Sequence, residues 1–554
     1  MVIDNDSLFH VKNAMIVLTD ELLLNYKRCN RRTYLELYGS ETEKDPQKEF
    51  LLKLRKENKQ HIREYIQENS LAPQKPQANS RDWLVKSEET ISLMRQGVDC
   101  IFYGCLYLSF DDWHNGINDR TLQPHNPLNT EIFADSTAFS ATDRENQPLE
   151  SQLFYSETAS NLKAQEIQLV ASPTLLIKQP GKSIFGDWFY VPINIKLGRR
   201  PKPEYKLIGA YHAQMLAIVQ EAFPTKSVLV LRQQNEYQVN LNHWLDRTRK
   251  IVNSCLEMLW LQLEPEVFIS RQKCSLCHWH SHCYDKAKSQ QHLSLVPGIT
   301  PKRYQSLKDM GLDDLESIAN RGDRYLEKRI GQDIAKQLRQ QARALLLDTA
   351  LIKKDYNFNH SYPLPDSAIE LYFDIEAEPD RNLDYLLGIL LVDKINKTQK
   401  FYPFLAETMA EEEAVWHEFF AFVNQYPQAP IFHFSEYEVD TIKRLARLYG
   451  TPRMQSKLIV SRCVDLHHWV TRSVVLPVES YSLKSLANWL GFRWREKTAS
   501  GDQSVCWYDQ WLTTKDRALL ELILNYNEDD CYATYYLKSW LADFLQEQSS
   551  IINY

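Results

Sequence analysis

The sequence has no long hydrophobic run and no excess of positive charge. Nowhere do about eighteen apolar residues follow one another, so we expect no membrane-spanning helix. Asp4 and Asp6 precede only short apolar runs, so we expect no secretory signal peptide. The net charge is −7, so nucleic acid would have to bind at a local basic patch. We therefore expect a cytoplasmic protein that is not associated with a membrane.

Disulfide bonds are not expected either, although the chain has ten cysteines. In a reducing compartment, cysteines serve as core residues or as metal ligands. A length of 554 residues is too great for one hydrophobic core. We therefore expect an α/β protein with two to four domains.

Two carboxylates share one predicted strand in the C-terminal part. Between Leu371 and Glu378, apolar residues alternate with Tyr372, Asp374 and Glu376. Because successive side chains of a strand point to opposite faces, Asp374 and Glu376 lie on the same face. Buried neighbouring carboxylates repel each other and lose hydration, and Mg²⁺ or Mn²⁺ is the usual remedy. The alternative is an exposed strand with an acidic face.

Three cysteines occur close together in a polar loop. Cys274, Cys277 and Cys283 are spaced so that they could hold one metal or cluster, which leaves one ligand to be found. The same loop holds three histidines: His278, His280 and His282. One of them would complete a zinc site. A remote cysteine would instead complete an iron–sulfur cluster.

Cys29 lies early in a predicted helix, far before this loop. One such cysteine followed by C-x₂-C-x₅-C resembles RecB-like nucleases with an iron–sulfur staple, a group that includes CRISPR-associated RecB-like exonucleases. The resemblance implies a PD-(D/E)XK-like α/β domain and a 4Fe–4S cluster that joins its two ends. The four implied cluster ligands are Cys29, Cys274, Cys277 and Cys283.

The acids of such nucleases are missing from this sequence. In that family, an Asp on one strand and (Asp/Glu)-x-Lys on the next hold the metal, whereas Thr174 and Asn194 stand at the two acidic positions here. Lys196 is retained, and Gln214 resembles the family's later Gln motif. A hydroxyl and an amide do not supply two negative charges, so we expect this site to have lost catalysis. Asp187 is a possible substitute carboxylate.

Lys196 also begins a basic segment. It is followed by Arg199, Arg200, Lys202 and Lys206. Such a strip could bind the phosphate backbone of nucleic acid. The alternative is a solvated loop.

Short predicted helices follow, with Gly298 and Gly311 at their breaks. This pattern resembles a helix-hairpin-helix unit, which usually holds a DNA phosphate on backbone N–H groups. A helical linker is the alternative. Pro363 and Pro365 then indicate a linker into the last domain.

Tyr526 and Asp530 are four residues apart, so they share one face of a predicted helix. They resemble the Tyr-x₃-Asp motif of DEDD exonucleases, in which the tyrosine orients the attacking water. Asp374 and Glu376 match the first acidic motif of that family. The resemblance implies two Mg²⁺ or Mn²⁺ ions and hydrolysis of a phosphodiester.

The order of predicted elements after residue 369 is three strands, helix, strand and helix, as in an RNase H-like fold. Glu438 stands where the middle acid of the DEDD pattern belongs, with Asp440 as the runner-up. Val464–Leu466 and Tyr481–Lys484 further resemble YprB-type RNase H-like domains. The four acids implied as metal ligands are Asp374, Glu376, Glu438 and Asp530.

The complete arrangement resembles a group of RecB-like nucleases. The expected parts are a RecB-like domain (1–290) with an insertion at about 111–164, a helix-hairpin-helix-like connector (291–350), a linker (351–368) and an RNase H-like, DEDD exonuclease-like domain (369–554). The leading hypothesis is a metal-dependent 3′–5′ exonuclease on DNA, with catalysis in the C-terminal domain and a degenerate RecB-like domain as substrate grip. The alternative is a non-catalytic nucleic-acid-binding scaffold in which both sites are degenerate.

Overall fold

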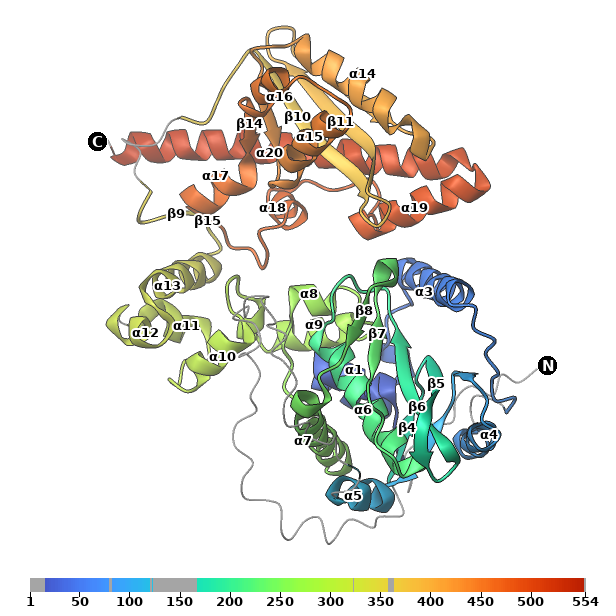
Figure 1. Cartoon of the computed structure of the whole chain (residues 1–554). Helices are drawn as coiled ribbons and strands as arrows, with labels where there is room; N and C mark the ends of the chain where they lie inside the picture. The colour runs from blue at the N-terminus through green and yellow to red at the C-terminus, as the bar shows by residue number, and fades with distance from the viewer. Residues whose placement is uncertain are drawn as a thin grey trace, which may run out of the picture. The chain divides into compact units, whose positions relative to one another are not determined.

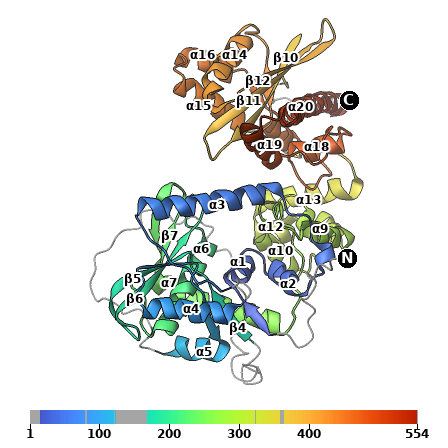
Figure 2. The ribbon, with the colours of Figure 1, turned by 90° about the vertical axis from the view of Figure 1, so that its right-hand side faces the viewer.

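The chain folds into two compact units, Met1–Lys286 and Ala287–Tyr554 (Figures 1 and 2). The computed structural model describes residues 15–78, 82–119, 122, 167–321, 323–356 and 363–552. The division between the units falls within α9 (His280–Ser289). Every helix in the described ranges is too short or too polar to cross a membrane.

A five-stranded sheet forms the centre of the first unit, in the order β2-β5-β6-β7-β8 (Figure 1). The strands are β2 (Cys100–Phe102), β5 (Leu175–Ser183), β6 (Gly186–Ile195), β7 (Val228–Val230) and β8 (Glu236–Gln238). β6 and β7 are parallel, and the other neighbours are antiparallel. One face of the sheet packs against α6 (Pro203–Gln220) and the other against α3 (Glu49–Glu68).

A second sheet of three strands has the order β1-β4-β3. Its strands are β1 (Ile16–Leu18), β4 (Ile167–Ala171) and β3 (Leu106–Ser109). The pattern of residues 166–178 predicts a single strand, but β4 and β5 belong to different sheets, so that prediction is wrong. The chain leaves β4 at Ser172, whose backbone N–H is bound by the Asp20 carboxylate, and Pro173 has no N–H for a sheet hydrogen bond.

Several further helices belong to the first unit. They are α1 (Asp20–Arg28), α2 (Asn30–Tyr38), α4 (Trp83–Arg95), α5 (Phe110–Asn118), α7 (Leu241–Trp260) and α8 (Arg271–Cys274). Ser109 and Asp112 form a capping box at the start of α5, and Trp113 is fully buried. The insertion expected over 111–164 therefore begins as a packed helix. Residues 120, 121 and 123–166 lie outside the described part of the chain.

The second unit contains a five-stranded sheet in the order β12-β11-β10-β13-β14. The strands are β10 (Ile369–Glu378), β11 (Leu383–Asp393), β12 (Thr398–Leu405), β13 (Ile431–His433) and β14 (Cys463–Asp465). The first three strands in the chain are antiparallel neighbours. β13 runs parallel to β10, and β14 runs parallel to β13.

The alternation predicted for β10 is confirmed by its packing. Phe373 and its neighbours at every second position pack against a core that includes α14 (Glu412–Asn424), α15 (Tyr437–Leu448) and α19 (Gly501–Thr514). Tyr372 lies on the opposite face and contacts Tyr535 of α20 (Arg517–Ile552). Asp374 and Glu376 lie two and four residues after Tyr372. Because side chains alternate along a strand, both lie on the same face as Tyr372, which α20 covers.

The predicted connector packs as part of the second unit. Its helices are α10 (Pro301–Lys308), α11 (Leu315–Asn320), α12 (Asp323–Ile330) and α13 (Gln332–Leu347). Gln341 of α13 donates to the Leu476 carbonyl at 2.7 Å and accepts from the Tyr481 hydroxyl at 2.9 Å. These hydrogen bonds tie the connector to the segment that precedes α18.

The segment expected as a linker, 351–368, contains a short strand. β9 (Leu351–Ile352) pairs with β15 (Val474–Val475), and residues 357–362 lie outside the described part of the chain. The remaining named helices of the unit are α16 (Arg453–Val460), α17 (Leu466–Ser473) and α18 (Leu483–Trp489).

Candidate metal centre

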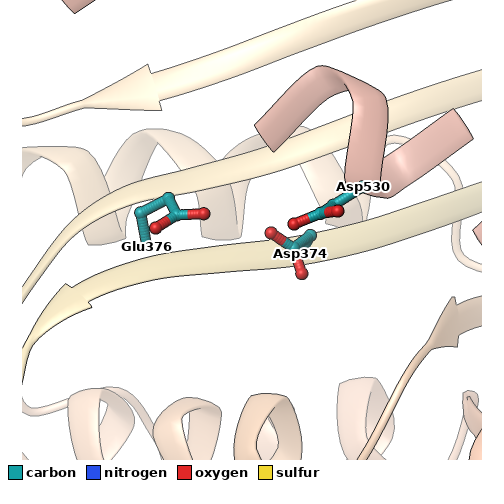
Figure 3. A group of neighbouring side chains, drawn as sticks. All are labelled: Asp374, Glu376 and Asp530. Carbon is teal, nitrogen blue, oxygen red and sulfur yellow. The ribbon is translucent and has the colours of Figure 1, made fainter. Parts of the chain in front are cut away.

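Three carboxylates from β10 and α20 meet on one face of the second unit's sheet (Figure 3). Asp374 and Glu376 come from β10, and Asp530 comes from α20. One oxygen of each carboxylate lies within 4.8 Å of the others. Oxygen ligands at this spacing suit a hard divalent cation such as Mg²⁺ or Mn²⁺.

The electrostatics of the three carboxyl groups favour a cation. Burial is the main cause that raises the pKa of Asp374, and the charges of Asp530, Glu376 and Glu438 raise it further. Burial followed by the charge of Asp530 raises the pKa of Glu376. Burial also raises the pKa of Asp530 to about 7. A divalent cation between these groups would favour their charged forms.

Glu438 lies beside this trio but is not part of the tight group. It is buried in the first turn of α15, and its charge contributes to the raised pKa of Asp374. The Ser435 hydroxyl donates to Glu438 Oε2 at 3.1 Å. The runner-up, Asp440, is exposed and forms an ion pair with Lys443 at 3.2 Å. The structure thus places Glu438, rather than Asp440, on the side of the metal centre.

Tyr526 lies one turn before Asp530 on α20. Burial and then the charge of Asp530 raise the pKa of the Tyr526 phenol. The phenol therefore keeps its proton at neutral pH and can donate a hydrogen bond.

The segment that carries these residues matches a known family. Residues 371–542 match the model of a family described as the RNase H superfamily. They form an RNase H-like domain. A search of the curated proteins found no match. The RNase H-like fold expected for the C-terminal part is thereby confirmed, and the domain is consistent with a phosphodiester hydrolase that acts on nucleic acid with Mg²⁺ or Mn²⁺.

Two residues of the RNase H-like domain that the sequence motifs did not single out hold the carboxylates. Asn527 Nδ2 donates to Asp374 Oδ2 at 2.7 Å. Trp494 Nε1 donates to Asp530 Oδ1 at 2.8 Å. Asn527 lies inside the Tyr-x₃-Asp motif and three residues before Asp530, so helical spacing could have indicated it. Trp494 lies in a loop, and no local pattern indicates its partner.

The four cysteines singled out in the sequence come together in the first unit. Cys29 lies between α1 and α2, and the other three lie in and around α8 and α9. All four are free thiols. Burial raises the pKa of Cys274, and the charges of Cys29 and Cys283 raise it further. Burial likewise raises the pKa of Cys277 to about 11.

The spacing of these thiols distinguishes between the two expected occupants. In a tetrahedral zinc site with Zn–S bonds of about 2.3 Å, the sulfur atoms are about 3.8 Å apart. Within the described chain, no three of the four sulfur atoms lie within 4.8 Å of one another. A cluster whose thiolates bind different iron atoms needs wider spacing. Among the described residues, the cysteines therefore do not form the tight group that a single zinc ion would hold.

Two histidines and one arginine lie within two residues of a cysteine: His278, His282 and Arg31. His278 forms an ion pair with Glu36 at 2.5 Å, and His282 lies 3.4 Å from Glu43, so both have carboxylate partners. Arg31 is buried, and its Nε and Nη2 groups have no hydrogen-bond partner among the described residues. Burial raises the pKa of Cys283, and Arg31 opposes that rise. Arg31 Nη1 is paired with Glu264 at 2.7 Å, so only the remaining donors of Arg31 are available to an anionic metal–thiolate group.

Three of the residues compared with RecB-like nucleases have uncharged side chains: Thr174, Asn194 and Gln214. Thr174 Oγ1 accepts from the Ile195 N–H at 3.2 Å, and Asn194 is buried on β6. Gln214 Oε1 accepts from Arg249 Nη2 at 2.6 Å. These contacts are structural, and they supply no charge for a metal ion.

The carboxylate whose charge acts most strongly on Lys196 is one that sequence reasoning missed. Burial lowers the pKa of Lys196, and the charge of Asp20 opposes that effect. Asp20 also contacts His212 Nε2 at 2.9 Å. Asp187, the substitute considered from the sequence, is instead exposed at the start of β6. Asn194 lies near the other end of the same strand. Asp20 comes from α1, some 176 positions before Lys196. No rule of residue spacing predicts that two residues so far apart in the sequence lie close together.

The predicted basic strip separates into two parts. Lys196 is half-buried and feels the charge of Asp20, whereas Arg199, Arg200 and Lys202 are exposed. Lys206 lies over the ring of Tyr237 at 5.0 Å. The exposed part of the strip is therefore limited to the loop before α6.

Proposed function

We propose that the RNase H-like domain is a two-metal 3′–5′ exonuclease that acts on DNA. The observation that carries the proposal is the group of three carboxylates, Asp374, Glu376 and Asp530, within 4.8 Å of one another. It lies in the segment that matches the RNase H superfamily. The RecB-like unit, which lacks acids at Thr174 and Asn194, would serve as a substrate grip.

The chain's own residues account for the chemistry as follows. Asp374, Glu376 and Asp530 would hold the ions, with Glu438 as the fourth acid. Bound Mg²⁺ or Mn²⁺ supplies a water of lowered pKa and neutralises charge at the phosphodiester. Tyr526, which stays protonated, would orient the attacking water. Trp494 holds Asp530 in place through its hydrogen bond to Oδ1.

A cleavage assay with defined ends tests the proposal. Single-stranded DNA labelled at either end is incubated with Mg²⁺ or Mn²⁺, with and without chelator. We expect wild-type protein to shorten the strand from the 3′ end, chelator to stop it, and Asp374→Asn or Asp530→Asn to reduce cleavage to background. Asp440→Asn is the matched control, because Asp440 is an exposed acid paired with Lys443. An RNA strand of the same sequence decides between the two nucleic acids.

Two results would contradict this assignment. If cleavage survives the Asp374→Asn/Asp530→Asn double change and is lost with Lys196→Ala, catalysis belongs to the RecB-like unit. If wild-type protein binds nucleic acid tightly and in a salt-dependent way without metal-dependent turnover, the chain is a scaffold.

We also propose that Cys29, Cys274, Cys277 and Cys283 hold a 4Fe–4S cluster. The spacing of the sulfur atoms and the unused donors of Arg31 support it. Protein purified without oxygen should be brown and contain iron and sulfide, and Cys29→Ser should remove the visible absorption. Cys463→Ser, in the other unit, should retain it. A colourless protein that contains zinc would contradict the cluster.

A further inference from the structure

The side chain of Asn527 is fully buried between α20 and the sheet of the RNase H-like domain. Its Nδ2 donates to Asp374 Oδ2 at 2.7 Å. Because Asn527 and Asp530 are three residues apart on one helix, α20 presents a metal ligand and a hydrogen-bond donor to another ligand from the same face. One oxygen of Asp374 is thereby held by the amide, and the other stays available to a cation.

Among the described residues, the N–H group of the Asn527 amide has a hydrogen-bond partner and the carbonyl oxygen has none. Oδ1 is buried and has no hydrogen-bond partner among the described residues. An unpaired buried acceptor is unfavourable, and an apolar side chain such as leucine would avoid it. The unpaired Oδ1 of Asn527 therefore lowers the stability of the fold, and the hydrogen bond from Nδ2 to Asp374 offsets this loss.

Gly388 provides the space that this amide occupies. It lies on β11 directly opposite Asp374. A Cβ atom at residue 388 would lie 1.7 Å from Asn527 Oδ1 and 2.8 Å from its Cγ. Gly388 is not among the glycines with positive φ, so room and not backbone conformation requires a glycine here. The Cys531 thiol donates to the Gly388 carbonyl at 3.5 Å, one turn further along α20.

We propose that Asn527 is a positioning residue for Asp374, and that Gly388 is the glycine that admits it. The amide fixes which oxygen of Asp374 faces the metal ion, and the pair sets how closely α20 approaches β11 at the site. This inference rests on the proposed metal-dependent function, and it names two residues that act through Asp374 without touching substrate.

Mn²⁺ binding to the full-length protein, measured by electron paramagnetic resonance titration, tests the role without relying on cleavage. Asn527→Leu keeps the branched shape of the side chain but removes the donor. We expect its Mn²⁺ affinity to fall about 10- to 100-fold, as for other groups that orient a metal ligand. At saturating Mn²⁺, cleavage by this variant should recover toward the wild-type kcat, whereas cleavage by Asp374→Asn should not.

A double-mutant cycle with Gly388 provides an independent check. Gly388→Ala should weaken Mn²⁺ binding in the wild-type background, because the new methyl group displaces the amide. In Asn527→Ala the methyl group no longer meets the amide and contacts only the ring of Phe401, 3.0 Å away, so Gly388→Ala should cause a much smaller further loss. If Gly388→Ala does not fold, as judged by thermal unfolding, the Mn²⁺ affinity of Asn527→Leu compared with that of the wild type still tests the donor.

The outcomes separate this proposal from the proposed function. Wild-type Mn²⁺ affinity in a folded Asn527→Leu protein would overturn the positioning role, whatever the activity. Weakened binding in the variants of a wild-type protein that binds Mn²⁺ but cleaves no nucleic acid would support positioning and overturn the nuclease. A wild-type protein that binds no Mn²⁺ would overturn both.

Discussion

Tyr526 lies one turn before Asp530 on the same helix. If the phenol orients the attacking water, Tyr526→Phe should lower kcat by about 10²-fold, while Mn²⁺ affinity stays close to that of the wild type. Tyr536→Phe is the matched control, because Tyr536 lies on the same helix and is 49% exposed. A wild-type kcat combined with a higher metal requirement would show that the phenol acts only on Asp530.

The raised pKa of Asp530 predicts a pH dependence of metal binding. The pKa of this carboxyl group is about 7 in the absence of metal, with burial as the main cause. A cation must displace the proton below that pH, and the pKa values of Asp374 and Glu376 are raised as well, so the apparent Mn²⁺ affinity should fall at least tenfold for each pH unit between about 7 and 5. The same titration at several pH values measures this. An affinity that does not change with pH would contradict a buried, protonated Asp530.

The Mn²⁺ affinity should rise with pH, whereas the stability of the metal-free protein should fall with pH. Below about pH 4, Asp530 is protonated in both the folded and the unfolded chain, so its burial carries no ionisation cost. Between about 4 and 7 the unfolded chain releases the proton first, so the free energy of unfolding falls as the pH rises through this window. With chelator present, the Tm should therefore be higher at pH 5 than at pH 7.5. Added Mn²⁺ should remove most of this difference.

At the scale of elements, side chains of β10 and α20 approach each other at two places on the same face of the sheet. Asp374 meets Asp530 at one, and Glu370 meets Lys538 Nζ at 2.8 Å at the other. Four strand residues span about 13 Å, and eight helix residues span about 12 Å. The separation between the two contacts is therefore nearly the same along the strand and along the helix. Lys538 and Glu370 are both buried, and the Tyr372 hydroxyl donates to Glu370 at 2.7 Å. The buried pair thus fixes the register that brings Asp530 to Asp374.

Replacing one member of this pair should destabilise the second unit. Lys538→Met leaves Glu370 buried with only Lys394 as a basic partner, so we expect the free energy of unfolding to fall by about 3 kcal/mol. Urea denaturation followed by tryptophan fluorescence measures the change. Lys443→Met, which breaks the exposed pair with Asp440, should cost less than about 1 kcal/mol. Equal losses in the two variants would contradict a register role for Lys538.

At the scale of the whole molecule, a net charge of −7 confines phosphate binding to local basic surfaces. Arg200 and Lys202 lie exposed in the loop before α6. If the first unit grips single-stranded DNA there, Arg200→Ala with Lys202→Ala should reduce the slope of log K against log salt by about 1.4. Fluorescence anisotropy at several salt concentrations measures it. Lys182→Ala with Lys226→Ala, elsewhere in the first unit, should leave the slope unchanged.

Local sequence patterns were enough to predict several parts of this molecule. The alternation around Asp374 placed two acids on one face of a strand, and the order of elements predicted the RNase H-like domain that the family match confirms. Both are short-range properties, because a strand repeats every two residues and a helix every three to four. The same reasoning was wrong for residues 166–178, where a hydrogen bond from Ser172 to Asp20 ends β4.

Other parts were decided only by the tertiary structure. Asn527 meets Asp374 across 153 positions of the chain, and Asp20 approaches Lys196 across a comparable distance. Nothing in the local sequence of either residue encodes its partner, because such contacts form when separate elements pack on one sheet. The sequence alone thus determined which residue types lie on which face. The packing of α20 over β10 and β11 determined which of them meet, and it did so where Gly388 leaves room.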